Sequence, residues 1–208
     1  MEAVWQLIEE AHNRYFQFKW YNNIALYTTR HSDQMILEKF NPRFLRQLHS
    51  DIIIDLDYNE GDSGDGLMTG QYALALGIKV ADCLPVYIFS KNKIGIIHCG
   101  WRGVIKGIAK KAVQYLDKYQ YALGASIGPC CYEIKEDVAD LFARKYPAAV
   151  ILKDNKYYLD LKSAVISDLG YHNMVGSLNY CTKCHPEYFY SHRQGDNLRR
   201  NHAVVLML

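Results

Sequence analysis

The feature that most constrains the fold is a pair of apolar runs, 84–89 and 94–97, separated by the short polar stretch 90–93. That stretch, Ser-Lys-Asn-Lys, is typical of a turn between strands, so the sequence predicts a β-hairpin. Cys83 stands just before the first run and His98 just after the second. Antiparallel pairing brings both to one end of the hairpin. A thiol and an imidazole held there form half of a metal site or a Cys/His catalytic pair.

Length and charge exclude several classes of protein. The chain has 208 residues, enough to bury a full core as a single domain spanning 1–208. The net charge is +2 and no run of like charge occurs, so we expect neither nucleic acid nor a membrane as partner. The first residues lack the cationic start of a secretory signal. We therefore expect a cytoplasmic protein, as a monomer or weak homodimer.

The cysteines allow more than one interpretation. In a cytoplasmic chain, free thiols or metal ligands are commoner than disulfides. Cys181, Cys184 and His185 match the c-type haem pattern, but haem attachment requires export, which we do not expect. A structural zinc site shared with Cys130 and Cys131 is a second possibility, although adjacent cysteines rarely ligate one tetrahedral metal well. We interpret these four residues as buried thiols near a loop.

Hydrophobic periodicity and turn residues predict the remaining elements. The expected helices are 2–15, 104–119, 136–146 and 160–170, the last with Asp160 as N-cap and Gly170 at its end. The expected strands outside the hairpin are 23–30, 52–54, 73–80, 122–127, 174–180, 188–192 and 203–208, with a loop over 57–66. No regular βαβ alternation appears. This pattern favours an α+β fold with mixed β-sheets flanked by helices, in α/β/β/α layers.

The strongest candidate site combines His49, Cys83 and His98. Each residue stands at the edge of a strand-like run, beside small or polar residues. Two nitrogens and one sulfur leave the fourth position of tetrahedral zinc open, which is the catalytic arrangement. The alternative is a buried cysteine and two histidines satisfied by backbone hydrogen bonds. Asp65 either orients a ligand histidine or serves only the turn around it.

A candidate anion site follows the hairpin. The segment 100–103, Gly-Trp-Arg-Gly, opens a helical pattern, so backbone N–H groups and Arg102 could converge on an anion. The segment 190–193 and the pair Arg199 and Arg200 add positive charge, or form only a solvated face.

At this point a family resemblance becomes apparent. It rests on 47–49, 65–69, 81–85, 98–103, 127–133, 159–161, 181–182 and 190–193, among which Ala-Asp-Cys and His-x-Gly-Trp-Arg-Gly are highly specific. Over residues 24–208 the chain resembles the laccase-domain, or polyphenol-oxidase-like, family. It departs from the family pattern at Val80, at Cys99 and in a short segment after Arg30.

The resemblance implies a function and a set of ligands. Members of the family phosphorolyse adenosine, inosine and methylthioadenosine, and also deaminate adenosine. Their metal ligands map onto His49, Cys83 and His98, which implies bound zinc, with copper as an alternative. Multicopper laccase chemistry is not implied, because it needs many histidines and this chain has eight, none of them in a His-x-His pair.

These considerations give a mechanism. We expect Cys83 and His98 to act at the catalytic metal and Arg102 to bind phosphate through its planar fork. Gln47 and Arg193 are expected to contact substrate. Zinc deaminases use a glutamate for proton transfer. No glutamate accompanies the ligand motifs, so Asp82 is the expected substitute.

Two other functions stay open. Cys83 and His98 could serve as nucleophile and base of a metal-free cysteine hydrolase. The short segment after Arg30 is also compatible with a metal-binding protein that has lost catalysis.

Overall fold

The structure, a computed structural model, describes residues 4–10, 13–32 and 34–208. Two six-stranded sheets make up most of it. The first contains, in spatial order, β1 (Gln6–Glu10), β2 (Asn13–Trp20), β3 (Asn23–Thr28), β15 (Asn201–Met207), β7 (Leu76–Val80) and β4 (Arg43–Phe44). The second contains β14 (Met174–Ser177), β10 (Tyr119–Leu123), β8 (Leu84–Ser90), β9 (Ile94–Cys99), β6 (Gly66–Thr69) and β5 (Ile53–Asp55). Parallel and antiparallel pairs occur in both sheets.

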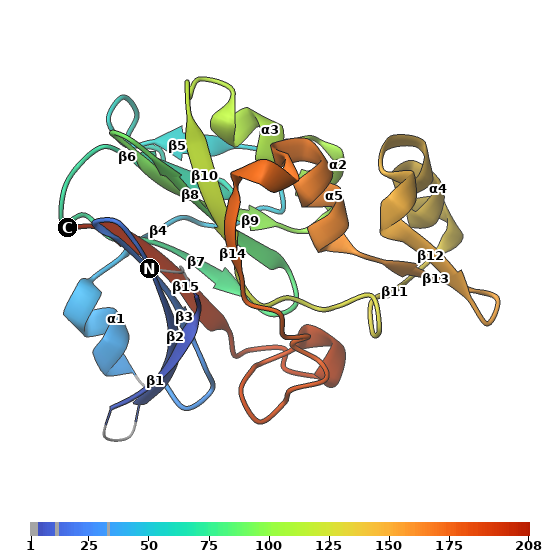
Figure 1. The fold of residues 1–208 in the computed structure, drawn as a ribbon. Helices are drawn as coiled ribbons and strands as arrows, with labels where there is room; N and C mark the ends of the chain where they lie inside the picture. The colour runs from blue at the N-terminus through green and yellow to red at the C-terminus, as the bar shows by residue number, and fades with distance from the viewer. Residues whose placement is uncertain (1–3, 11–12, 33) are drawn as a thin grey trace.

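Helices cover the outer face of each sheet (Figure 1). The helix α1 (Gln34–Phe40) lies outside the first sheet, and α2 (Trp101–Ile105), α3 (Ile108–Val113) and α5 (Leu161–Leu169) lie outside the second. One hydrophobic core fills the space between the sheets, and another lies between the second sheet and its helices. The predicted α+β single domain with α/β/β/α layers is therefore confirmed.

The predicted hairpin is confirmed as β8 and β9. Its register pairs Leu84 with Cys99 and Pro85 with His98. Alternate residues serve opposite cores: Val86 and Ile88 face the helices, whereas Tyr87 and Phe89 face the first sheet. Both faces of the hairpin are buried, which explains why its strands are continuous apolar runs rather than alternating ones.

The helix predicted over 136–146 is confirmed as α4 (Glu136–Lys145). The helix predicted over 160–170 is also confirmed, as α5 (Leu161–Leu169). The Asp160 carboxylate caps it by accepting a hydrogen bond of 3.1 Å from the Ser163 N–H, and Gly170 ends it. The prediction of one helix over 104–119 is wrong. Gly107 adopts φ 83° and separates α2 from α3, and Tyr119 already begins β10.

The N-terminal prediction is also wrong. The described part of 2–15 forms β1 and the start of β2 rather than a helix, and residues 2, 3, 11 and 12 lie outside the described residues. Ile8 pairs with Tyr15 in an antiparallel ladder. The helical spacing was misleading because Val4 and Leu7, 58% and 37% exposed, do not lie in a core.

The segment 188–192 is not a strand. Its backbone pairs with a side chain: the Tyr190 N–H donates to Asn201 Oδ1 (3.0 Å), and Asn201 Nδ2 donates to the Tyr190 carbonyl (2.9 Å). Phe189 is fully buried against Phe16 and Tyr27. Aromatic packing, not strand pairing, explains the apolar pattern of this segment.

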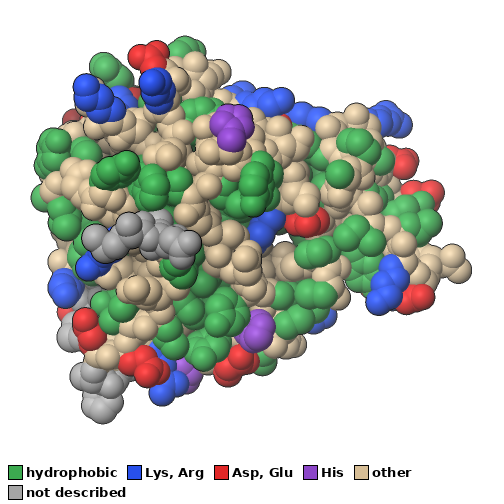
Figure 2. Space-filling model, in the orientation of Figure 1, with side chains coloured by type: hydrophobic (Ala, Val, Ile, Leu, Met, Phe, Trp, Pro, Cys, Tyr) green, Lys and Arg blue, Asp and Glu red, His purple; other side chains and the backbone are tan. Residues whose placement is uncertain are grey.

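A third sheet was not predicted. It consists of β11 (Glu133–Ile134), β13 (Lys156–Leu159) and β12 (Val150–Lys153). Asp154 and Asn155, with φ 51° and 57°, form the turn between β12 and β13. This pair of polar residues is a hairpin signal in the sequence. Together with α4 the sheet projects from one edge of the molecule (Figures 1 and 2), while Phe142 and Leu159 pack into the core beside the second sheet.

Among the described residues, no helix is both long enough and apolar enough to cross a membrane.

His202 is expected to make the protein less stable in acid. Burial, followed by the charge of Lys79, lowers its pKa from 6.5 to about 4. The unfolded chain takes up this proton first, so stability is retained above pH 6.5 and lost as the pH falls toward 4, by up to about 3 kcal/mol. Chemical unfolding of wild type and His202→Gln between pH 7 and pH 4 measures this difference. An equal pH dependence of stability in wild type and His202→Gln would contradict the role of His202. The control is His172→Gln, because His172 is exposed.

Candidate metal site

Three candidate ligands lie together at one end of the β8–β9 hairpin. His49 comes from the loop between β4 and β5, Cys83 directly precedes β8, and His98 belongs to β9. Their ligand atoms all lie within 4.8 Å of one another, and the two imidazoles meet edge to face at 80°. The antiparallel hairpin thus brings Cys83 and His98 together as the sequence predicted.

Asp65 fixes the two histidines. It is fully buried, and its Oδ1 accepts hydrogen bonds from His98 Nδ1 (2.8 Å) and from the His49 backbone N–H (3.0 Å). Its Oδ2 accepts three more, from the Leu48 N–H and from the backbone and hydroxyl of Ser50. These bonds hold His49 at φ 54°, a conformation that a non-glycine residue adopts only when its surroundings impose it. Asp65 therefore orients the site, beyond any role in its own turn.

Charges within the group favour a thiolate. Burial alone would raise the pKa of Cys83, but the charge of His98 and interactions with both histidines lower it to about 6. Burial alone would lower the pKa of His98, whereas Cys83 and Asp65 raise it to about 9. Burial alone would raise the pKa of Asp65, but hydrogen bonds from His98 and Ser50 hold it well below the usual range.

The donor set suits a zinc ion. Asp65 accepts the Nδ1 proton of His98, which leaves Nε2 as the free ligand nitrogen, an arrangement common around protein-bound metals. A thiolate and two imidazoles are ligands that zinc prefers, and three protein ligands leave one position open. The alternative, in which the histidines are satisfied by backbone hydrogen bonds, does not fit His98, because its Nδ1 bonds to the Asp65 side chain. His49, Cys83 and His98 could therefore hold the metal.

The three residues line a cavity of about 670 Å³. Among the described residues that line it, Asp82 is the one carboxylate. The basic side chains are Arg46, Lys79, Arg102, Arg193 and Arg200, and Trp101 and Tyr132 supply aromatic walls. A cavity with this excess of positive charge favours an anionic ligand.

Two predicted site residues have other partners. Gln47 pairs both ends of its amide with the Lys79 backbone: its Nε2 donates to the carbonyl (2.9 Å) and its Oε1 accepts from the N–H (2.8 Å). The Asp82 carboxylate accepts from the Thr182 hydroxyl (2.7 Å) and from the Arg193 N–H (2.8 Å). These contacts give both residues positioning roles, while both side chains also line the cavity.

The two arginines are better placed for ligand binding. Arg102 is exposed, and its guanidinium lies 4.4 Å from the ring centre of Trp101. Arg193 lies over the ring of Tyr132 and donates one bond to the Glu133 carbonyl. Stacking on an aromatic ring holds a guanidinium in one plane while its N–H groups stay available.

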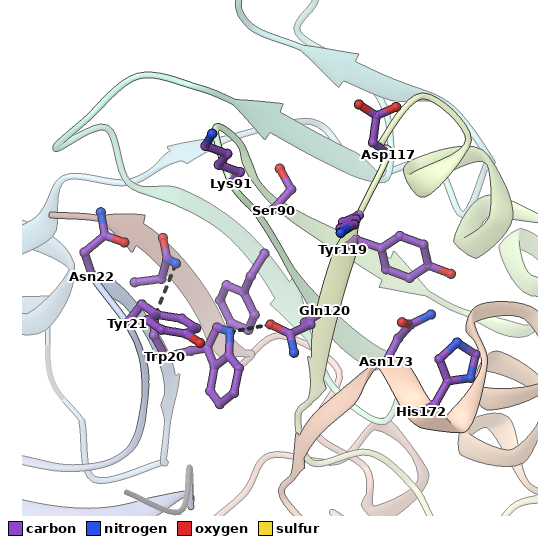
Figure 3. A pocket seen from close by; sticks show the side chains of 13 residues that line it. Trp20, Tyr21, Asn22, Ser90, Lys91, Asp117, Tyr119, Gln120, His172 and Asn173 are labelled. Atoms are coloured by element: carbon purple, nitrogen blue, oxygen red, sulfur yellow. Dashed lines mark hydrogen bonds between the residues drawn. The ribbon is translucent and has the colours of Figure 1, made fainter.

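A larger hollow, about 780 Å³, lies at the opposite end of β8, around Ser90 (Figure 3). Its lining includes Trp20, whose Nε1 donates 2.9 Å to Gln120 Oε1. None of the candidate metal ligands lines it. Size alone therefore does not identify the candidate site.

Gly100→Ala is expected to weaken metal binding without unfolding the protein. A Cβ at this position would meet Cys83 Sγ and His49 Cδ2, each at 3.2 Å, so both ligands would have to move. Titration with a competing chelator measures the affinity. Gly95→Ala is the matched control, because its Cβ would crowd Met68 at 3.2 Å instead. Unchanged metal affinity in Gly100→Ala would contradict this placement.

Several residues around the cavity were not predicted as parts of a site. Ser50 donates hydrogen bonds to Asp65, and the Thr182 hydroxyl donates one to Asp82. Tyr132 and Arg200 line the cavity. Thr182 and Tyr132 stand inside the motifs that carried the family resemblance. Arg200, in contrast, has only its charge as a sequence signal.

Comparison with known proteins identifies the family. The family described as multi-copper polyphenol oxidoreductase laccase matches residues 22–208, and the chain belongs to it. A purine nucleoside phosphorylase from Clostridium acetobutylicum is 34% identical over an alignment of 181 residues, which covers 78% of this chain and 75% of that protein. One from Borreliella burgdorferi is 29% identical over 94% of this chain and 96% of its own length. The human purine nucleoside phosphorylase LACC1 is 32% identical over 72% of this chain, which spans 39% of that protein.

A solved structure confirms the fold. YlmD from Geobacillus stearothermophilus superposes with a TM-score of 0.83 over 99% of both chains, at 24% identity. The copper in the family description is not matched by a histidine-rich cluster. Within the described residues, the two groups of side chains suited to a metal ion contain two histidines between them.

Proposed function

We propose that this chain is a zinc-dependent purine nucleoside phosphorylase acting on adenosine, inosine and methylthioadenosine, with adenosine deamination as a side activity. The observation that carries the proposal is the open His49, Cys83 and His98 group in a cavity lined by arginines. The names of the relatives support a phosphorylase of this class. Zinc bound by these residues would supply a Lewis acid at an open coordination position.

The basic residues suit the phosphate. In phosphorolysis a phosphate oxygen bonds to C1′ of the ribose while the C1′–N bond to the base breaks, giving ribose 1-phosphate and free base. Arg102 and Arg193 can each offer two parallel N–H groups to phosphate oxygens, and Lys79 adds a point charge. Their combined charge would lower the barrier by holding phosphate against C1′.

The aromatic residues suit the base. Trp101 and Tyr132 line the same cavity, each with an arginine over one ring face. Flat rings of this kind would hold a purine by stacking. Asp82, through its bonds to Thr182 and Arg193, would keep the two loops that form this wall in place.

The test is a chromatographic assay. Protein of known metal content is incubated with adenosine, with and without phosphate, and adenine, inosine and hypoxanthine are followed. Adenine release that requires phosphate supports the proposal. Inosine as the only product would make deamination the main reaction, and no product from zinc-loaded protein would contradict both activities.

Arg102→Lys is expected to raise the KM for phosphate about 10-fold or more, because an ammonium replaces a bidentate pair of charge-assisted bonds with a single one. Initial rates at varied phosphate concentration measure this. Arg14→Lys, at an exposed site in β2, is the control. An unchanged phosphate dependence would remove Arg102 from the phosphate site.

A metal-free cysteine hydrolase is the second candidate. The close approach of Cys83 to His98 favours it, since a paired thiolate is a nucleophile. Zinc would withhold that thiolate from reaction. Hydrolysis of amide or ester substrates that increases when metal is removed would favour this candidate over the phosphorylase.

A metal-binding protein without catalysis is the third candidate. In the described part of the connection from β3 to β4, α1 is the one helix, which is less than the resemblance leads one to expect. Measurable turnover of any purine nucleoside would exclude this candidate.

A further inference from the structure

A second group of potential metal ligands lies outside the candidate active site. Cys130 and Cys131 lie in the turn region between β10 and β11, and Cys181 and Cys184 follow β14. Their four Sγ atoms all lie within 4.8 Å of one another. Segments about 50 residues apart in the sequence thus bring every one of these thiols to a single point. The expectation of four buried thiols is wrong, because Cys130 and Cys184 are exposed and Cys131 and Cys181 are half-buried.

The sulfur positions match a tetrahedral ion. Cys184 Sγ lies 3.6 Å from Cys130 Sγ and 3.3 Å from Cys131 Sγ. A disulfide requires about 2.05 Å, so these are separate thiols. Zinc–sulfur bonds of about 2.3 Å place tetrahedral ligands about 3.8 Å apart. The spacings of 3.6 and 3.3 Å fall slightly short of that value, and all the other sulfur pairs lie within 4.8 Å.

The backbone holds the cysteines in this arrangement. The Cys184 and His185 N–H groups both donate to the Cys181 carbonyl, and the Cys131 N–H donates to the Gly128 carbonyl at 3.0 Å. The Gly128 N–H also donates to Cys181 Sγ (3.2 Å). Such N–H to sulfur bonds stabilise a thiolate. The turn at Gly128 allows the adjacent cysteines to approach one centre, which removes the objection drawn from the sequence.

Nearby basic side chains would compensate the net negative charge of a zinc ion bound by four thiolates. Lys135, Lys183 and Arg193 line a hollow of about 640 Å³ together with Cys130 and Cys131. The one carboxylate among the described residues lining that hollow, Glu133, pairs with Lys156. Basic groups therefore dominate the surroundings.

We propose that Cys130, Cys131, Cys181 and Cys184 bind one Zn²⁺ in a structural site. Four sulfur ligands in tetrahedral geometry are typical of zinc, and a closed site with no open position is structural rather than catalytic. Binding replaces four S–H protons, which leave to solvent, with four Zn–S bonds, so no oxidant or reductant is needed.

The site would hold two loops of the candidate active site together. One loop carries Tyr132, and the other carries Thr182 and Arg193, all of which border the cavity or contact Asp82. Ser126 and Cys181 already form an isolated β-bridge between them. Zinc would join the loops beyond that bridge. Binding itself does not depend on the proposed catalytic function.

The test measures zinc per chain in full-length protein purified without oxygen. Wild type is expected to hold two equivalents, Cys83→Ala one, and the double variant Cys130→Ser with Cys181→Ser one. Cys99→Ser, which changes a buried cysteine outside both groups, should hold two. A double variant that keeps two equivalents, or Cys83→Ala with none, would overturn the proposal.

A second measurement serves if the double variant fails to fold. Cys83→Ala is loaded with Co²⁺ and its absorption spectrum is recorded. Four thiolates give intense sulfur-to-cobalt absorption in the near ultraviolet together with visible bands of a tetrahedral site. Absence of these bands would overturn the proposal. So would bound iron in the purified protein, or a disulfide joining Cys184 to Cys130 or Cys131 in freshly purified material, detected by mass spectrometry without reduction.

Discussion

Asp65→Asn is expected to weaken metal binding by about 10- to 100-fold and to cost about 3 kcal/mol of stability. The carboxylate accepts five hydrogen bonds, from His98, Leu48, His49 and Ser50, and has no exposed surface. In asparagine an NH₂ group replaces one of the two carboxylate oxygens. This NH₂ group would point at N–H and O–H groups that themselves need an acceptor. His98 and the His49 loop lose their common anchor. Chelator competition and chemical unfolding measure the two effects.

Asp57→Asn is the matched control. Asp57 also accepts several hydrogen bonds from a loop, from Thr69 and Gly70, and pairs with Lys93. It contacts none of the three candidate ligands, so its loss should reduce stability while metal affinity stays unchanged. Equal metal affinity in Asp65→Asn and wild type would show that Asp65 does not orient the site.

Cys83→Ala is expected to abolish phosphorolysis and to remove the metal from the candidate active site. Histidines bind a metal ion as neutral imidazoles, so Cys83 would be the one charged ligand, and its loss removes both a bond and the charge that balances the ion. The remaining histidines offer two neutral nitrogens. Metal analysis and the nucleoside assay on the same preparation measure both consequences.

Cys99→Ala controls for the loss of a buried cysteine near the site. Cys99 follows His98 in β9 but faces the helix-side core. It should keep full metal content and activity. Full metal occupancy at this site in Cys83→Ala would show that the ligand is wrongly assigned, and full activity without metal would contradict the mechanism.

The sequence predicts the centre of the fold well because its signals there are local. The β8–β9 hairpin has two apolar runs and a polar turn, and α5 has an N-cap and a terminal glycine. These interactions are made within a few residues of each other. The N-terminal strands differ, because β1 depends on pairing with β2, and of its two apolar side chains Leu7 is exposed and Ile8 is half-buried.

The candidate ligands were predictable for a similar reason. Hairpin geometry placed Cys83 beside His98, ligand chemistry at the edges of strand-like runs added His49, and the family motifs pointed to the same three residues. The contacts of Gln47 and Asp82 were not predictable. Each side chain binds backbone or a hydroxyl from a segment at least 32 residues away, and nothing in its immediate sequence indicates that partner. Likewise, only the fold shows that four dispersed cysteines share one centre.

The most direct test of the account is phosphorus NMR of the reaction with inosine and phosphate, using zinc-loaded wild type and Cys83→Ala. The inorganic phosphate signal is expected to be replaced by that of ribose 1-phosphate in wild type only, in step with hypoxanthine release. Ribose without phosphate would mean hydrolysis. Ribose 1-phosphate formed equally by Cys83→Ala would place the reaction away from His49, Cys83 and His98 and contradict the central claim.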